Sequence, residues 1–280
     1  MRSLRRRWSG RSWSSVFALA VLGGLVLMAV GAPWITPFSP HRSAGPALVP
    51  PSSVHWLGTD VLGLDLWTLI VYGARVSLLV ALSTALLAGL GGAVLGMLAG
   101  FRGGWLDAVV MRLVDVFVIL PELPLIIVIT AFAGPSLTTI IVVLAIFSWS
   151  RPARIARAQT LSLKEQPYIR MAQLYGGSSW YILVTYLVPE TLPILIASML
   201  RLAGRAVVLE ASMAFLGLGD PMTRSWGQII NRALDFPGLV FTPFWRWWLL
   251  YPWLFLVLLV GSLAVIGREM ERIADTRLQS

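Results

Sequence analysis

Long apolar runs separated by short polar segments dominate the chain. One of them, residues 76–101, contains no charged side chain and is followed directly by Arg102. A helix needs about 20 consecutive apolar residues to cross the ~30 Å hydrocarbon core of a bilayer. The pattern therefore predicts an all-α membrane protein with six transmembrane helices, in residues 16–34, 76–101, 113–133, 137–154, 182–215 and 247–266.

Several of these spans are irregular. Prolines interrupt the third and the fifth predicted span: Pro121, Pro124, Pro189 and Pro193. The apolar run of the fourth span ends at Trp149. This span reaches membrane thickness only if its helix continues through Arg151 and Arg154, with their charged ends snorkelling to the interface.

The polar segments between the spans define the expected organisation. The first span and its arginine-rich tail resemble a signal peptide, but no convincing small-x-small cleavage site follows, so we expect an uncleaved helix. The chain then divides into a tail at 1–15, a first helix at 16–34, an external segment at 35–75, a five-helix membrane core at 76–266 with a cytoplasmic loop at 151–180 and an external loop at 216–246, and a tail at 267–280.

Composition and charge support this topology. Hydrophobic residues make up 57% of the 280 residues and charged residues 12%, whereas soluble domains carry about a quarter charged residues. The net charge of +9 comes from basic residues at the ends of apolar runs, which indicates membrane orientation rather than nucleic-acid binding. With both termini in the cytoplasm, 15 of the 22 basic residues fall on the cytoplasmic side, as the positive-inside rule requires. An aromatic belt then lies at the outer boundary: Trp245, Trp247, Trp248 and Trp253.

The chain lacks the residue sets that most enzymes need. It has no cysteine, and Lys164 is its single lysine, with no glycine-rich phosphate loop around it. Its two histidines, His41 and His55, stand in no zinc-binding helix motif, and there is no nucleophile-elbow serine. We therefore expect no catalytic residue, no metal and no cofactor on this chain. If the protein performs work, another chain supplies the energy.

Three glycines in the second span repeat at every fourth position: Gly92, Gly96 and Gly100. Small residues at this spacing let a second helix approach closely. The alternative is a compositional bias, because glycine is frequent in membrane helices. The repeat over two turns favours a helix-packing face.

The predicted cytoplasmic loop contains a short amphipathic helix. Pro167 suits its first position, and Gly176 with Gly177 suits its end, which gives nine helical residues. Four side chains at i, i+3, i+4 and i+7 form one apolar and aromatic face: Tyr168, Met171, Ala172 and Tyr175. Such a helix fits a partner's groove or the lipid headgroups, and the pattern alone leaves both open.

The same segment carries a family resemblance. Residues 168–176, followed by 187–189, resemble the EAA loop of binding-protein-dependent ABC importer permeases. The wider chain resembles the dipeptide, oligopeptide and nickel permease family in stretches 55–60, 72–78, 103–107, 111–115, 210–219 and 225–227. Together these cover most of residues 55–230 in the family's order.

This resemblance implies the type I ABC importer fold in a bacterial inner membrane. It implies a translocation subunit that carries peptides or related small solutes, with nickel chelates as a further option, by alternating access. Its partners would be a second homologous permease subunit, one or two ABC ATPase subunits that bind ATP and Mg²⁺, an external substrate-binding protein and the lipid bilayer. The coupling residues would be Tyr168, Arg170, Met171, Ala172, Tyr175, Gly176 and Pro189.

The chain departs from the family pattern at a few positions. Arg170 stands where the family has a glutamate and Met171 where it has an alanine, and Leu64 replaces a usual arginine. The charge reversal at Arg170 predicts a changed contact with the ATPase.

Four charged residues fall inside predicted spans and are candidates for the translocation path: Arg201, Arg205, Glu210 and Glu122. Arginine at mid-bilayer costs about 2.5–3.5 kcal/mol on insertion scales. Arg201 and Arg205 therefore either lie near the outer interface or face a water-filled cavity. Lining the path, they would favour an anionic group such as a peptide carboxylate.

A self-contained secondary transporter or channel is the competing interpretation. It requires buried coupling carboxylates and inverted repeats. Glu122 and Glu210 could serve as the carboxylates, but the sequence shows no convincing repeat.

Overall fold

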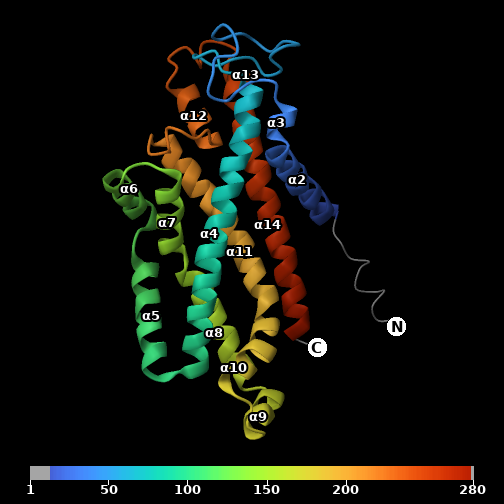
Figure 1. Cartoon of the computed structure of the whole chain (residues 1–280), viewed down its shortest axis with the longest axis vertical. Helices are drawn as coiled ribbons and strands as arrows, with labels where there is room; N and C mark the ends of the chain where they lie inside the picture. Colours follow the sequence, from blue (N-terminus) through green and yellow to red (C-terminus); the bar gives the residue numbers. More distant parts are fainter. Residues whose placement is uncertain (1–12, 279–280) are drawn as a thin grey trace. The chain divides into compact units, whose positions relative to one another are not determined.

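The computed structural model describes the backbone of residues 13–278 and the side chains of residues 13–273. The expected tail at 1–15 therefore lies mostly outside the described residues. Helices dominate, and the described part contains no strand beyond one isolated bridge between Thr59 and Asp65. The helices are α2 (Trp13–Val30), α3 (Ala32–Ile35), α4 (Leu66–Arg102), α5 (Gly104–Ile119), α6 (Glu122–Ala133), α7 (Leu137–Ser148), α8 (Ser150–Lys164), α9 (Pro167–Leu174), α10 (Ser179–Ile182), the π-helical turn η1 (Leu183–Leu187), α11 (Val188–Phe215), α12 (Trp226–Leu234), α13 (Trp245–Trp248) and α14 (Leu250–Leu278) (Figure 1).

Five helical stretches among the described residues are long and apolar enough to cross a membrane, and α5 with α6 gives a sixth if that bent pair forms one span. The axes of α5 and α6 differ by 90°. Leu120 at the break is extended, because the residue before a proline is disfavoured in the helical region. The prediction of an all-helical membrane protein is confirmed.

The helix bounds differ from the expected segments in several places. The third span was expected from 113, but α5 already begins at Gly104. Helix α4 begins at Leu66, ten residues before the expected start at 76, because Asp65 Oδ2 accepts hydrogen bonds from Thr68 N at 2.8 Å and Thr68 Oγ1 at 2.7 Å and so caps its first turn. Most of the expected loop at 151–180 is helical, since α8 runs to Lys164. Helix α14 continues to Leu278 instead of ending at 266.

The chain forms two compact units. Of the described residues, unit 1 contains 13–81, 134–140 and 204–266, and unit 2 contains 82–133, 141–203 and 267–278. Helices α4, α7, α11 and α14 contribute residues to both units.

Unit 1 is centred on Trp226 at the start of α12. This side chain is fully buried, and its Nε1 donates to Ile70 O at 2.9 Å. Gly73 leaves the space for it, because a Cβ there would meet the indole ring at 2.7 Å. In the same unit, Arg75 donates from Nε to Ala29 O at 2.5 Å and from Nη2 to Val30 O at 3.1 Å. Arg75 thereby ties the last carbonyls of α2 to α4.

Unit 2 is built on the close approach of α4 and α8. A Cβ on Gly92 would lie 2.3 Å from Trp149 O, and one on Gly96 would lie 2.0 Å from Ala153 O. Gly100 faces Arg157 O at 3.0 Å. The three glycines therefore lie against one face of α8, where the two backbones come into direct contact.

Ion pairs join the other side of α8 to α5. Arg157 donates to both carboxylate oxygens of Asp107, at 2.5 and 2.7 Å. Arg154 pairs with Asp115 at 3.0 Å. These pairs give Arg154 and Arg157 of α8 partners within the protein, so two of the basic residues in this extension of the fourth span are neutralised by carboxylates of α5.

Candidate functional site

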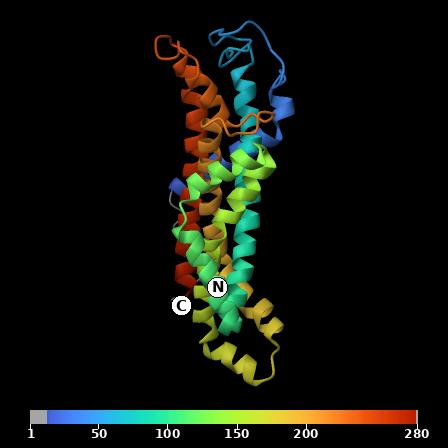
Figure 2. The same cartoon turned by 90° about the vertical axis from the view of Figure 1, so that its left-hand side faces the viewer.

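The most distinctive surface of unit 2 is the short helix α9. It follows α8 through a two-residue link and lies beyond the ends of α8 and α10 in both views of the chain (Figure 2). Pro167 occupies its first turn, where a missing N–H costs nothing. Gly176 has φ +82° just after the helix, a conformation that other residues adopt with strain. The next helix begins at Ser178, whose Oγ accepts from Tyr181 N at 3.2 Å.

Helix α9 is anchored through its inner face. Ile169 is fully buried and packs in a cluster with Leu163, Ile182 and Leu187, which come from α8, α10 and η1. Phe101, at the end of α4, packs on the same cluster. A displacement of α9 therefore acts directly on four neighbouring elements, because packed interiors transmit strain.

The outer face of α9 carries exposed apolar side chains. Leu174 is 79% exposed and Tyr175 is 84% exposed, and Tyr168 and Met171 are also exposed. The expected face differs in one member: Ala172 is half-buried and packs on the Ile169 cluster, whereas Leu174 lies in the open. The hydrophobic pattern did not single out Leu174, because the helix ends there and the chain turns.

Two polar contacts fix the ends of this region. The Tyr168 hydroxyl donates to Glu190 Oε1 at 3.3 Å. Partial burial of the ring, together with this carboxylate, raises the pKa of the Tyr168 phenol, so the hydroxyl stays a hydrogen-bond donor. Lys164 Nζ donates to Phe101 O at 2.7 Å and lies over the Phe101 ring, 5.6 Å from its centre. Pro189 is exposed in the first turn of α11, directly after the π-helical turn.

Arg170 has a partner within the chain. Its guanidinium pairs with the carboxylate of Glu165, the residue that directly follows α8. Both side chains are largely exposed, so the pair contributes about 0–1 kcal/mol to stability. The pair balances the positive charge that Arg170 brings to this surface.

The four charged candidates inside the spans have different surroundings. In unit 2, Ser148 Oγ donates to Glu122 Oε1 at 3.3 Å. Arg201 pairs with Glu271 near the end of α14. In unit 1, Glu210 is buried with its Oε2 unpartnered, while Arg205 interacts with other groups of the protein.

The pair of Arg201 with Glu271 bears on the depth of Arg201. Glu271 belongs to the segment 267–280, for which the sequence predicts the cytoplasmic side. In the topology expected from the sequence, the pair puts Arg201 in the inner half of the membrane and not at the outer interface. No local sequence pattern indicates this pair, because the two residues lie on helices α11 and α14, far apart along the chain.

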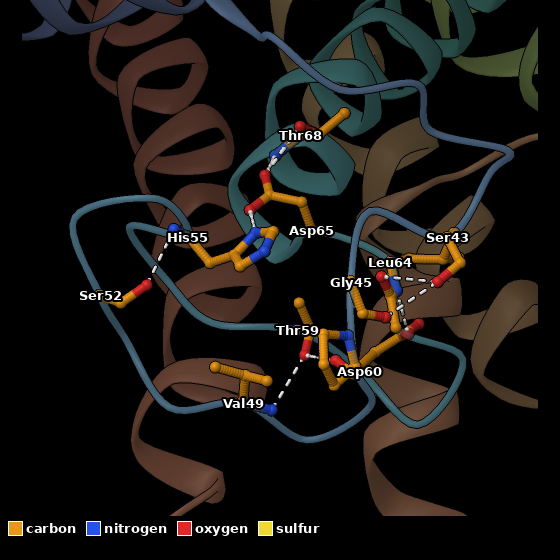
Figure 3. A network of polar contacts seen from close by, with 12 residues as sticks. Ser43, Gly45, Val49, Ser52, His55, Thr59, Asp60, Leu64, Asp65 and Thr68 are labelled. Carbon is orange, nitrogen blue, oxygen red and sulfur yellow. Dashed lines mark hydrogen bonds and ion pairs between the residues drawn. The ribbon is translucent and has the colours of Figure 1, made fainter.

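A compact polar network precedes α4 in unit 1 (Figure 3). His55 Nδ1 lies 3.0 Å from Asp65 Oδ1, and the imidazole stacks on Phe38 with 5.0 Å between ring centres. Asp60 Oδ1 accepts from the backbone N–H groups of Leu62 and Leu64, each at 2.8 Å. Burial nevertheless raises the pKa of the Asp60 carboxyl. The stretch 55–60 is therefore a folded cap on the first turn of α4.

Two glycines let this network close. Gly58 has φ +78°, and a Cβ there would lie 2.3 Å from Val49 O. Gly63 has φ +71°, and a Cβ there would lie 2.2 Å from the carbonyl oxygen of Gly45. Any other residue at either position would push the loop open.

The structure also explains the stretches 210–219 and 225–227 in unit 1. A Cβ on Gly227 would lie 2.7 Å from both Cα and O of Ala211, so α12 packs directly on α11. Ser225 caps α12, with its Oγ accepting from Gln228 N at 3.3 Å.

Among the described residues, no group of three or more His, Cys, Asp or Glu side chains could hold a metal ion.

Comparisons with known proteins agree with this architecture. The model of the family described as binding-protein-dependent transport system inner membrane component matches residues 92–280. The chain is 36% identical over 263 residues to the dipeptide transport system permease protein DppC of Bacillus subtilis, an alignment covering 93% of this chain and 81% of that protein. It is 32% identical over 270 residues to the oligopeptide transport system permease protein OppC of the same organism, covering 95% and 86%. It is 34% identical over 231 residues to the glutathione transport system permease protein GsiD of Pectobacterium atrosepticum, covering 82% and 75%.

The chain therefore belongs to the inner-membrane permease subunits of binding-protein-dependent transport systems, within the peptide transport family of ABC importers. It is a multi-pass inner-membrane protein. The resemblance found in the sequence is confirmed at the level of the family.

Proposed function

We propose that this chain is the subunit through which an ABC importer moves peptides or related small solutes across the inner membrane by alternating access. Both termini lie in the cytoplasm in this proposal. A partner ATPase binds ATP and Mg²⁺ and drives the motion. The observation that carries the proposal is helix α9, which combines a fully buried anchor at Ile169 with an exposed apolar face ending at Leu174 and Tyr175.

Helix α9 is the docking element for the ATPase. A short helix with an exposed aromatic and aliphatic face fits a hydrophobic groove of a partner protein. The buried cluster under Ile169 links α9 to α4, α8, α10 and η1, so motion of a bound ATPase reaches the membrane helices through it. The single lysine supports a separate ATPase, because Lys164 Nζ is engaged with Phe101 O and no phosphate loop surrounds it.

The complete importer contains further chains. A second homologous permease completes the pathway, and one or two ATPases dock on the cytoplasmic side. An external binding protein delivers the substrate and determines much of its identity. Peptides come first among substrates because the similar proteins are named for dipeptide, oligopeptide and glutathione transport. Nickel chelates are the alternative substrate class, and uptake assays with peptides and with nickel chelates would test it.

The charged residues of the spans form part of the path in this proposal. Arg201 and Arg205 are the proposed partners of a peptide carboxylate, which for Arg201 competes with Glu271. Glu122 and Glu210 line or shape the same route in this proposal. Replacing both arginines with glutamine is expected to weaken uptake of anionic peptides more than uptake of neutral ones. Equal transport of both classes by the double variant would remove the arginines from the path.

Reconstitution tests the function as a whole. Liposomes that contain this chain with its co-purified ATPase and binding protein are expected to accumulate peptide only with ATP and Mg²⁺. The alternative of a self-contained secondary transporter predicts accumulation by the chain alone under an ion gradient. Transport without any ATPase would overturn the proposal.

A matched pair of variants tests the docking role of α9. Leu174→Ala removes an exposed apolar side chain from the docking face, whereas Leu161→Ala removes the partly exposed side chain of the same residue type from α8. We expect the first variant alone to lose co-purified ATPase. Equal retention by both variants would place the ATPase contact elsewhere.

A further inference from the structure

Helices α4 and α8 run side by side in the same direction in unit 2. The three glycines of α4 at 92, 96 and 100 each face a backbone carbonyl oxygen, and these oxygens belong to Trp149, Ala153 and Arg157. Both series advance by four residues, so the two helices are parallel. Each helix carries roughly half a negative charge at its C-terminal end. Parallel packing brings these two negative ends near each other, where a cation is favoured.

Lys164 supplies a cation that joins the two ends. It is the last residue of α8, and its Nζ donates to Phe101 O at 2.7 Å. Phe101 belongs to the last turn of α4, and the last carbonyls of a helix have no partner within the helix. A basic side chain both satisfies such a carbonyl and compensates the negative helix end. The same Nζ lies over the Phe101 ring, 5.6 Å from its centre, which adds a cation–π contact.

The glycine contact by itself leaves the axial position of α8 on α4 weakly fixed. Helices usually hold their register through side-chain ridges that pack into grooves of the neighbour, and glycine has no side chain to form a ridge. The ion pairs of Arg154 and Arg157 hold α8 to α5, not to α4. The hydrogen bond from Lys164 supplies the directional contact between α4 and α8 that the glycine face lacks.

This contact lies directly beside the anchor of α9. Leu163, the neighbour of Lys164, is a buried member of the Ile169 cluster, and Phe101 packs on the same cluster. A two-residue link then connects Lys164 to the start of α9. A displacement of α9 therefore acts first on the end of α8, and the hydrogen bond to Phe101 O passes it on to α4.

We propose that Lys164 is a positioning residue for transport, whose clamp on the end of α4 fixes the axial register of α8 and makes both helices follow α9. Lys164 acts through α4 and touches no substrate. This inference rests on the proposed docking of the ATPase on α9 and adds the residue that shares the motion between two membrane helices. Without the clamp, the docking face stays intact while α8 moves without α4.

The composition of the chain makes the clamp directly observable. Lys164 is the single lysine, so the full chain labelled with ¹⁵N-lysine gives one side-chain ammonium signal in magnetic resonance. In nanodiscs of phosphatidylethanolamine and phosphatidylglycerol, we expect this ammonium to exchange its protons with water severalfold more slowly than free lysine. Phe101→Leu, which removes the ring and keeps the backbone carbonyl, should shift the signal. Exchange as fast as in free lysine would show that the clamp does not form.

Spin labels then measure the register of the two helices. The chain has no cysteine, so labels are attached through Arg102→Cys at the end of α4 and Leu161→Cys on α8, both at exposed positions. With Lys164 in place, we expect a narrow distribution of distances between the labels. Lys164→Met keeps a long side chain without the ammonium and should broaden the distribution severalfold, whereas Lys164→Arg should keep it narrow. Equal widths with lysine and methionine would overturn the clamp.

Transport by the assembled importer tests the positioning role. The complex is prepared with the natural chain, Lys164→Met, Lys164→Arg or the control Arg102→Met, which removes an exposed cation from the same turn of α4. All four should retain the ATPase, because none changes the exposed face of α9. Only Lys164→Met should consume severalfold more ATP per imported peptide. Its KM for peptide should equal that of the natural chain, because Lys164 does not contact the substrate.

The two proposals fail in different ways. An unchanged ratio of ATP to peptide in Lys164→Met, with the ATPase retained, would overturn the positioning role and leave docking on α9 intact. Loss of the ATPase from Lys164→Met but not from Arg102→Met would also overturn it, because Lys164 would then belong to the docking surface. Import by the natural chain without any ATPase would overturn the proposed function itself, and the role of Lys164 in coupling with it.

Discussion

The closest backbone approach in unit 2 allows a sharp test of how α4 and α8 pack. Replacing Gly96 with alanine would place the new Cβ 2.0 Å from the carbonyl oxygen of Ala153 and 2.9 Å from its Cα. These are backbone atoms, so no side chain can rotate away. Ordinary van der Waals contact begins at 3.4 Å, and the two helices must therefore separate by more than an ångström.

Gly91 provides the matched control on the same helix. A Cβ at this position would meet nothing within 4 Å. Alanine in place of a helical glycine stabilises the helix by about 0.5–1 kcal/mol, and both variants share this gain. The difference between Gly96→Ala and Gly91→Ala therefore isolates the packing term, which for overpacking is about 1–3 kcal/mol.

The assay is thermal unfolding of each variant in the same nanodiscs, followed by tryptophan fluorescence. At about 2–4 °C per kcal/mol for a chain of this size, Gly96→Ala should unfold roughly 2–12 °C below Gly91→Ala. Transport by Gly96→Ala should also fall, because α8 leads directly into α9. The packing argument is wrong if the two variants unfold at the same temperature.

Three further predictions address other parts of the chain. Ile169→Ala should remove most of a fully buried side chain of α9 at a local cost of about 2–5 kcal/mol. ATP hydrolysis should then continue while peptide uptake falls, and normal uptake per ATP would contradict the transmission of motion through the Ile169 cluster. Arg75→Met should lower the stability by about 1.5–3 kcal/mol in thermal unfolding, because charged hydrogen bonds to α2 are lost. The control Arg42→Met, which changes an exposed arginine, should not lower it. Equal effects of the two variants would show that the contact of Arg75 with the end of α2 does not stabilise the protein. The pKa of the buried Asp60 carboxyl is raised above its ordinary value of 3.8, so its contribution to stability is largest below that value and is lost as the pH rises through the raised pKa. Asp60→Asn should therefore gain stability relative to the natural chain as the pH rises from 4 towards neutrality, and a difference that stays constant with pH would exclude this source of pH dependence.

The intrachain partner of Arg170 changes how the altered EAA-like segment is interpreted. The sequence alone predicts a reversed charge at the ATPase contact. Glu165 balances that charge from the end of α8, so the surface around α9 is close to neutral and mainly apolar. In the proposed docking of α9, the altered residue therefore requires a smaller change in the ATPase than the sequence alone suggests.

Much of the candidate site follows from local sequence. Pro167 and Gly176 mark the limits of α9, because one lacks an N–H and the other adopts a positive φ. The glycines at 92, 96 and 100 indicate a close helix contact through their spacing. These signals depend on neighbours within a few residues, which a sequence displays directly.

Other features depend on residues far apart along the chain. The pairs of Arg157 with Asp107 and of Arg201 with Glu271 each join separate helices. The tie from Arg75 to the end of α2 spans 46 residues at Ala29. The hydrophobic periodicity of the sequence does not indicate such partners, since each pair depends on how whole helices are placed side by side.

Hydropathy and charge placement by themselves determined that this chain is a helical membrane protein. The free-energy cost of burying charges and backbone in lipid depends on the composition and length of each apolar run, and both are visible in the sequence. Motif order determined its family. Only the tertiary structure decided which helix the glycines meet, which face of α9 is anchored at Ile169 and which is free at Leu174, and that Arg170 already has a counter-charge. The physical reason is that packing and ion pairing are properties of surfaces assembled from distant segments, whereas transfer into lipid is a property of each segment alone.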